Sequence, residues 1–150
     1  MLGLSDKTKE AELFYDILHP GLTSLGQMKD DKPNPSCKIK LDTLDNYCKD
    51  NKIVHIHALK IDVEGFELDV LKGARNMLKN KAIDFIQFEL SDTFLARFGL
   101  APKIVSDLLG SLEYKIYDFD ENLDVFSGPL KILPPGNNNF YSSHKDLAKL

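Results

Sequence analysis

Two apolar runs with a helical pattern between them dominate the middle of the chain. Residues 53–63 are almost continuously apolar, which is typical of a strand covered on both faces of a sheet. Residues 64–80 follow with apolar side chains at helical spacing, and residues 83–90 form a second apolar run. The order strand, helix, strand predicts a βαβ unit whose two strands lie parallel.

Shorter elements flank this unit. Asp42, with Asp45 three residues later, indicates the N-terminus of a short helix, and Pro102 indicates the first turn of another. The pattern also predicts strands at residues 10–17, 38–41, 113–119, 123–126 and 139–142, a charged loop at 29–36, and a helical turn in the tail 143–150. We therefore expect one α/β domain over residues 1–150, with a mixed sheet that ends in an antiparallel hairpin at its C-terminal edge.

Composition narrows the class of protein. The chain has 150 residues, 43% of them hydrophobic, which suits one domain with a real core. Its net charge of −4 argues against general attraction to nucleic acid. With two cysteines and no apolar run of about 18 residues, it indicates neither a disulfide framework nor a membrane span. We expect a soluble protein in a reducing compartment, the cytoplasm.

Several common site motifs are absent. No two of the nine glycines are separated by a single residue, so the sequence has no Gly-x-Gly turn for a dinucleotide or nucleoside cofactor. Gly21 and Gly26 have the outer spacing of a P-loop, but Gln27 and Met28 follow where Lys and Ser or Thr are needed. Metal-ligand spacings are absent as well, and we expect no metal.

Acidic residues follow both apolar runs. Asp62 and Glu64 come at the end of the first run, and Glu89 and Asp92 at the end of the second. Because ligands of open α/β sheets bind beyond the carboxyl ends of the strands, we expect these carboxylates on one rim. Gly65 permits a tight turn beside them.

Residues 59–67, Leu-Lys-Ile-Asp-Val-Glu-Gly-Phe-Glu, followed by Val-Leu-Lys-Gly-Ala at 70–74, resemble the signature of FkbM-type methyltransferases. Weaker similarity in residues 5–7, 22–25 and 41–45 extends the resemblance from about Leu4 to Tyr141. The resemblance implies a Rossmann-like class I fold, the cofactor S-adenosylmethionine, and methyl transfer to a hydroxyl of a small molecule, sugar or lipid.

The resemblance also implies roles for the acidic residues. It places Asp62 near the methyl donor, as a catalytic and cofactor-binding residue, and Glu64 is the better candidate for a base that takes the acceptor's proton. Glu89 and Asp92 are candidates for substrate contacts. The family's Gly-rich loop has no counterpart here, so we expect the chain to match the C-terminal portion of the domain, truncated at its N-terminus, and to bind cofactor weakly by itself.

Other interpretations of the same residues remain open. Asp62 and Glu64 also suit the start of a helix, where acidic side chains stabilise the dipole by roughly 0.3–1 kcal/mol. His55 and His57 are two apart, and a packed pair is favoured over a metal pair. The alternative function is a non-catalytic, partner-binding module of the same fold. Exposed apolar surface around the first run would favour a homo-oligomer.

Overall fold

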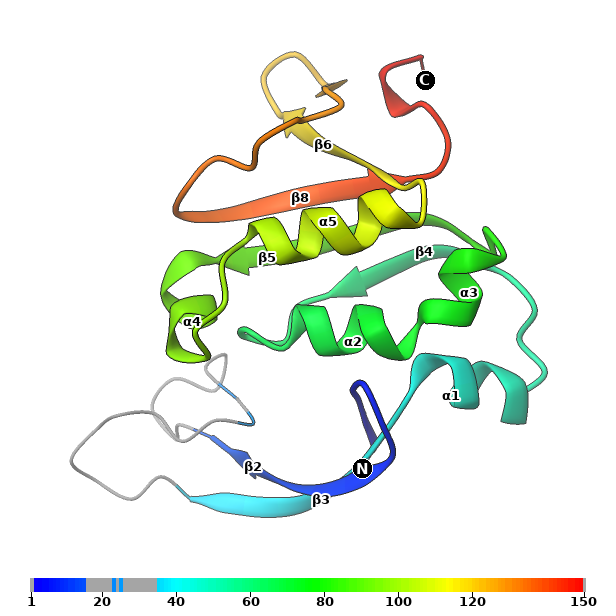
Figure 1. Cartoon of the computed structure of the whole chain (residues 1–150), viewed down its shortest axis with the longest axis vertical. Helices are drawn as coiled ribbons and strands as arrows, with labels where there is room; N and C mark the ends of the chain where they lie inside the picture. The colour runs from blue at the N-terminus through cyan, green and yellow to red at the C-terminus, as the bar shows by residue number, and fades with distance from the viewer. Residues whose placement is uncertain (1, 16–22, 24, 26–34, 150) are drawn as a thin grey trace.

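The computed structural model describes residues 2–15, 23, 25 and 35–149, and its strands form two sheets (Figure 1). The smaller sheet has the order β1-β3-β2, and the larger has the order β4-β5-β8-β6-β7. The smaller sheet consists of β1 (Leu2–Leu4), β2 (Lys9–Phe14) and β3 (Ser36–Asp42). The larger consists of β4 (Ile56–Ile61), β5 (Ile83–Ser91), β6 (Lys115–Asp120), β7 (Val125–Ser127) and β8 (Asn137–Ser143).

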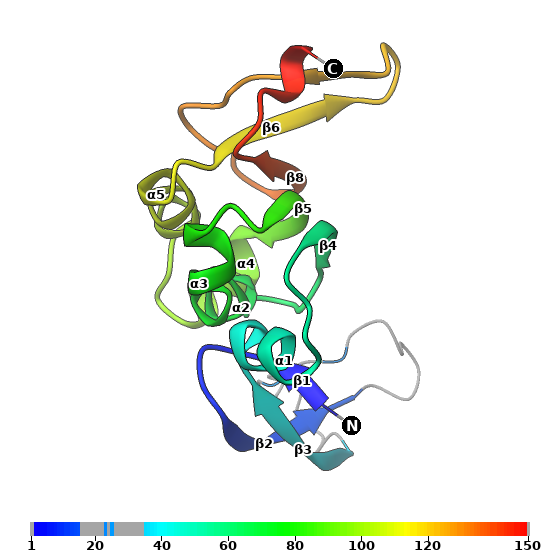
Figure 2. The same cartoon turned by 90° about the vertical axis from the view of Figure 1, so that its right-hand side faces the viewer.

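The helices are α1 (Leu44–Asp50), α2 (Glu67–Gly73), α3 (Arg75–Lys79), α4 (Asp92–Arg97) and α5 (Lys103–Ser111), with a 3₁₀ turn η1 at Leu147–Lys149. α2, α3 and α5 lie on one side of the larger sheet, whereas α1 lies next to β1 of the smaller sheet (Figure 2). In β5, Ile86, Phe88 and Leu90 are buried and join the core. The residues that alternate with them, Phe85 and Gln87, are only partly buried. The core therefore lies mainly between the sheet and its helices.

The predicted βαβ unit is confirmed. β4 and β5 pair in parallel, with Ile56 opposite Ile83 and Ile61 opposite Phe88, and α2 and α3 connect them. β8 runs antiparallel to both β5 and β6, and β6 pairs with β7 in an antiparallel hairpin at the sheet edge. The molecule thus has the predicted α/β architecture with a mixed sheet.

The prediction that the first apolar run is a strand covered on both faces is wrong. β4 is six residues long and is an edge strand, since only β5 pairs with it among the described residues. His57, Ala58 and Lys60 are exposed, and Val54 lies before the strand with 85% of its surface accessible. Apolar content alone did not distinguish an edge strand from a central one.

The helix predicted over residues 64–80 is two helices. It begins only at Glu67 and breaks at Ala74, from which α3 starts anew. The carboxylate of Asp45 accepts hydrogen bonds from the backbone N–H groups of Asn76 (2.8 Å) and Met77 (3.0 Å), so it caps α3 from outside that helix. α1 is capped by Thr43 rather than Asp42, because the Thr43 hydroxyl accepts from the N–H of Asn46.

Gly73 brings the two parts of the molecule together. A Cβ at Gly73 would lie 2.0 Å from the backbone oxygen of Ser5, so only glycine permits this contact between α2 and the segment after β1. Ser5 is itself fixed by its N–H, which donates to the Asp42 carbonyl at 2.8 Å. This close approach anchors the smaller sheet against the helices.

The sequence pattern missed β1 and α4, which are only three and six residues long. The other predicted strands are present with boundaries that differ by a few residues. Residues 16–17 of the first predicted strand and residues 29–34 of the charged loop lie outside the described residues.

Candidate functional site

A tight turn follows β4 and determines where the first acidic pair lies. Glu64 and Gly65 both have positive φ angles, 54° and 100°. Such angles are unfavourable for glutamate and easy for glycine, so the turn holds some backbone strain at Glu64. A Cβ on Gly65 would lie 3.1 Å from Cβ of Phe94, which shows how closely α4 covers the turn.

The carboxyl ends of β4 and β5 meet around a small hollow, called here the carboxylate hollow. Its lining combines carboxylates from the turn, α2 and β5 with one hydroxyl and one aromatic ring: Asp62, Glu64, Glu67, Glu89, Ser91 and Phe94. None of these lining residues is basic. Three of the four residues predicted to share a rim, Asp62, Glu64 and Glu89, are therefore brought together by the parallel pairing.

Glu67 is the buried member of the hollow. Only 2% of its surface is accessible. Its Oε1 accepts a hydrogen bond from the N–H of Gly65 at 3.1 Å, whereas its Oε2 is buried with no hydrogen-bond partner. Burial raises the pKa of Glu67, the backbone N–H donors of the turn oppose that rise, and the charge of Asp62 adds to it.

Glu64 is half-buried beside it. Burial is the main cause that raises the pKa of Glu64 above its ordinary value, and the charges of Glu89, Asp62 and Glu67 raise it further. Arg97 on α4 acts in the opposite direction as the smallest influence. A carboxylate with a raised pKa holds a proton more readily, which is the property required of a general base.

The rim of the hollow holds the remaining polar contacts. Lys60 Nζ lies 3.0 Å from Asp62 Oδ2 in an exposed ion pair, and the hydrogen bond to Asp62 raises the pKa of Lys60. The Asn137 side-chain amide donates to Glu89 Oε1 at 2.7 Å, which links β8 to the site. Asp62 and Glu89 thus have side-chain partners at the rim, whereas the hydrogen bond to Glu67 comes from the backbone of Gly65.

Asp92 does not join the hollow. Its Oδ2 accepts from the N–H of Gly136 at 2.8 Å, and its own N–H donates to the Gly136 carbonyl at 3.1 Å. It lines a separate, mainly apolar cavity of about 480 Å³ with Pro102, Ile132 and Leu133. The turn that starts α4 directs Asp92 away, because Ser91 and not Asp92 is the last residue of β5.

His55 and His57 lie at the amino end of β4, away from the hollow. The rings of His55 and His57 pack edge to face, 4.8 Å between centroids, and His55 Nε2 lies 3.0 Å from Asp84 Oδ2. Within the described part of the chain, no group of three or more His, Cys, Asp or Glu side chains is arranged to hold a metal ion. No helix among the described residues is long and apolar enough to cross a membrane.

Glu67 was not among the site residues predicted from the sequence. A signal was present. In the sequence, Glu67 stands at helical spacing from Leu71, Ala74 and Leu78, all of which are fully buried. A charged residue on a buried apolar stripe requires a specific environment, and here the turn and the hollow provide it.

Comparison with known proteins gives one finding. The family model described as the methyltransferase FkbM domain matches residues 4–124. No curated protein and no solved structure is similar enough to this chain to count as a match. The matched range contains the turn after β4 and all the residues that line the carboxylate hollow.

Proposed function

The chain belongs to the FkbM methyltransferase domain family, and from that premise we propose that the carboxylate hollow is the reaction site for methyl transfer. The donor is S-adenosylmethionine and the acceptor is a hydroxyl of a small molecule, sugar or lipid. The observation that carries this proposal is the convergence of Asp62, Glu64, Glu67 and Glu89 at the carboxyl ends of two parallel strands.

The hollow itself has no space for a water-sized molecule, but Asp62 also lines a separate cavity of about 260 Å³ with Leu4 and Phe66. S-adenosylmethionine carries a sulfonium, an ammonium and ribose hydroxyl groups, and the Asp62 carboxylate can accept hydrogen bonds from the last two. When bound, it supplies an electrophilic methyl group. The task of the protein is to align donor and acceptor and to remove the proton of the acceptor hydroxyl.

Glu64 is the proposed base. Methyl transfer joins the acceptor oxygen to the methyl carbon and breaks the carbon–sulfur bond, and the hydroxyl proton passes to the Glu64 carboxylate. Burial and neighbouring carboxylates raise the pKa of Glu64, so its basicity is closer to what proton removal at neutral pH needs.

The other acidic residues have supporting roles in this proposal. Asp62, at the end of β4 and paired with Lys60, orients the donor. Glu89, held by Asn137, contacts the acceptor from the end of β5. Asp92 contributes at the neighbouring apolar cavity, where a bulky acceptor would extend away from the hollow.

We also assign the larger sheet to a Rossmann-like class I arrangement. Two features support this assignment: the parallel β4–β5 pair with its helical connection, and the antiparallel β8 inserted between β5 and β6. The exposed edge of β4 is the side on which further parallel strands would extend such a sheet.

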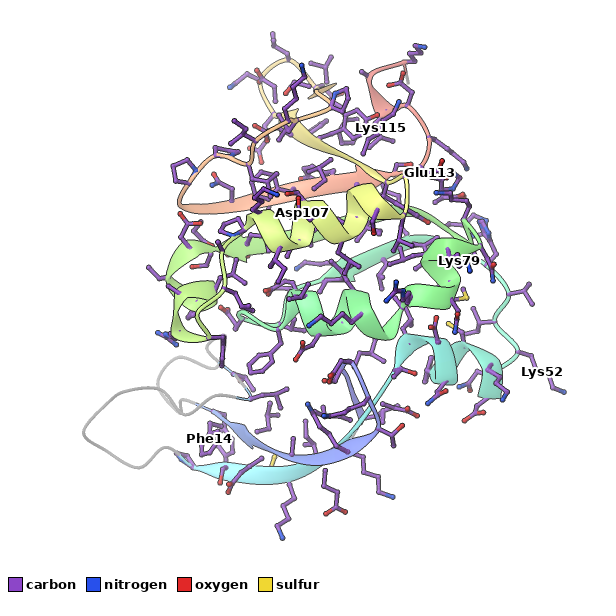
Figure 3. All side chains as sticks on the ribbon, in the orientation of Figure 1. Phe14, Lys52, Lys79, Asp107, Glu113 and Lys115 are labelled. Atoms are coloured by element: carbon purple, nitrogen blue, oxygen red, sulfur yellow. The ribbon has the colours of Figure 1, made fainter. Side chains whose placement is uncertain are left out.

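The test is transfer of a ¹⁴C-labelled methyl group from S-adenosylmethionine to a panel of hydroxyl compounds: sugars, long-chain alcohols and phenols. Wild-type protein is compared with Glu64→Gln and with the control Glu113→Gln. Glu113 also has a positive φ, 58°, but lies in an exposed loop at the opposite end of the sheet (Figure 3). Transfer that Glu64→Gln abolishes and Glu113→Gln retains supports the proposal. Absence of transfer and of donor binding in the wild type would favour a non-catalytic module.

A further inference from the structure

The apolar cavity that Asp92 lines is large enough for a small molecule. It has a volume of about 480 Å³ and lies between the start of α5 and the loop that leads into β8 (Figure 1). Small-molecule sites typically have volumes of about 300–1,000 Å³ and mainly apolar linings. Several residues of this lining have apolar side chains: Ala101, Pro102, Ile132, Leu133 and Pro135. Size and lining therefore fit a ligand site, in contrast to the carboxylate hollow.

The loop side of the apolar cavity is fixed at both ends. The N–H of Leu130 donates to the carbonyl of Ile116 at 2.7 Å, which ties the loop to β6. Near the start of β8, the N–H of Gly136 donates to Asp92 Oδ2 at 2.8 Å, which ties the loop to α4. Ile132 lies between these two anchors, yet 85% of its surface is accessible. The fold therefore positions this apolar side chain without covering it, as expected for the wall of a preformed site.

The polar residues of the lining differ in how far the fold uses them. The Ser106 hydroxyl donates to the Lys103 carbonyl at 2.9 Å, and Lys103 Nζ lies 2.6 Å from Asp107 Oδ1. Lys131, in contrast, has no hydrogen bond or ion pair with any described residue. The lining thus combines few free hydrogen-bonding groups with an unpaired ammonium. A sugar, whose hydroxyl groups each need a partner, suits it poorly, whereas an apolar molecule with one anionic group suits it well.

We propose that the apolar cavity binds an amphipathic small molecule, whose apolar body packs against Ile132 and Leu133 and whose anionic group pairs with Lys131. Burial of the exposed surface of Ile132 favours the apolar part. Two lysines against one aspartate in the lining favour the negative charge. The inference rests on the proposed function where it identifies this molecule as the methyl acceptor. Asp92 in the cavity directly follows Ser91 in the carboxylate hollow, so the two places adjoin.

Binding is measured with octanoate, a soluble fatty-acid anion without a hydroxyl group. In protein with ¹³C-labelled methyl groups, we expect saturable shifts of the Ile132 and Leu133 resonances. Leu123 is the control, because it is 70% exposed and lies in the β6–β7 hairpin. Octylammonium, which has the same chain length and the opposite charge, should bind more weakly, and glucose should cause no saturable shift. No saturable shift with octanoate, or tighter binding of octylammonium or glucose, would overturn the proposal.

Two variants test the two parts of the ligand. Lys131→Met removes the charge, keeps an unbranched side chain and should raise the Kd of octanoate by about two- to fivefold, as expected for one exposed ion pair. Ser106→Phe fills the cavity from α5 and should abolish the binding of octanoate. Lys52→Met is the matched control for charge, because Lys52 is exposed and lies after α1, away from the cavity (Figure 3). Its Kd should equal that of wild type.

Thermal melts of each variant separate binding from folding. Lys131→Met changes an exposed side chain and should melt like wild type, so it decides by itself if Ser106→Phe does not fold. A Kd of octanoate that Lys131→Met leaves unchanged, or that Lys52→Met raises equally, would overturn the proposal.

The transfer assay separates this site from the proposed function. If the bound molecule is the acceptor, ω-hydroxyoctanoate should receive the labelled methyl group, octanoate should inhibit competitively, and Lys131→Met should raise KM more than it lowers kcat. Methyl transfer that octanoate does not inhibit would overturn the acceptor assignment. Saturable binding of octanoate by a protein that neither binds S-adenosylmethionine nor transfers methyl groups would retain the site and reject the proposed function.

Discussion

β5 carries an acidic residue near each end, and the two ends have opposite electrostatics. Near its amino end, Asp84 is surrounded by cations and histidines: Lys145 Nζ at 2.7 Å, His55 Nε2 at 3.0 Å and His144 Nε2 at 3.5 Å. Near its carboxyl end, Glu89 lies among other carboxylates in a hollow that no basic residue lines. The same strand thus places Asp84 beside cations and Glu89 beside other carboxylates.

The pKa values of the acidic residues shift in opposite directions at the two ends. The hydrogen bonds from Lys145 and His55 hold the pKa of Asp84 well below its ordinary value. Burial and mutual repulsion raise the pKa of Glu64 and of Glu67. A paired acid stabilises the fold, whereas crowded buried acids destabilise it and are typical of functional sites. This difference supports the proposed reaction site at the carboxyl end of the sheet.

The largest expected effect is on turnover. Glu64→Gln removes the base and should lower kcat by about 10²–10⁴-fold, the usual contribution of general base catalysis. Asp84→Asn should leave kcat unchanged, since Asp84 lies at the other end of the strand. In the wild type, kcat should decrease at pH values below the pKa of Glu64. Because that pKa is raised, the decrease should begin above about pH 4.3, the ordinary pKa of glutamate. Equal losses in the two variants would erase the distinction between the ends.

Glu67→Gln should stabilise the folded protein at pH 7 by about 1–3 kcal/mol, because it replaces a buried acid with a neutral amide. In the wild type, Glu67 has a folded-state pKa above its unfolded value, so the fold gains stability as pH falls through the folded-state pKa towards about 4.3. Thermal melts of both proteins from pH 8 to pH 4 measure this effect. A wild-type melting temperature that is constant over this range, with no gain in the variant, would contradict it.

The contribution of Asp84 to stability should have the opposite pH dependence. Asp84→Asn should change the melting temperature less than Glu67→Gln does. The pKa of Asp84 in the folded state lies below its unfolded-state value of about 3.9. Ionised Asp84 therefore stabilises the fold fully at pH values above about 3.9, and this stabilisation is lost as pH falls through the folded-state pKa. Asp84→Asn should therefore melt below wild type at pH 6, and the gap should narrow below pH about 4. A gap that stays constant down to pH about 2 would show that packing, not charge, is responsible.

The smallest effect concerns backbone strain, which both ends share. Glu64 and Glu113 have φ angles of 54° and 58°. Glu113→Gly should relieve strain and stabilise the protein by a few tenths to about 1 kcal/mol. The gain is reduced because glycine loses more conformational entropy on folding than glutamate does. Glu64→Gly relieves the same strain but removes the proposed base. Denaturant unfolding and turnover measured together distinguish the two, and loss of turnover in Glu113→Gly would show that strain at that end also matters.

The sequence by itself determined the βαβ unit and the placement of three acidic residues. Apolar runs at 53–63 and 83–90 with a helical pattern between them leave few alternatives to parallel pairing, and parallel strands bring their carboxyl ends together. Asp62, Glu64 and Glu89 therefore meet as predicted. Periodicity and chain direction are local properties, and both can be read from the residues alone.

Only the tertiary structure decided which acids are functional candidates and which are structural. Asp92 turns to the Gly136 N–H, Asp45 caps α3 across the fold, and Glu67 is buried beneath a left-handed turn. β4 is an edge strand although its run is the most apolar of the chain. Each outcome depends on partners distant in sequence, and burial and charge pairing are properties of the assembled surroundings rather than of a residue's own neighbours in the chain.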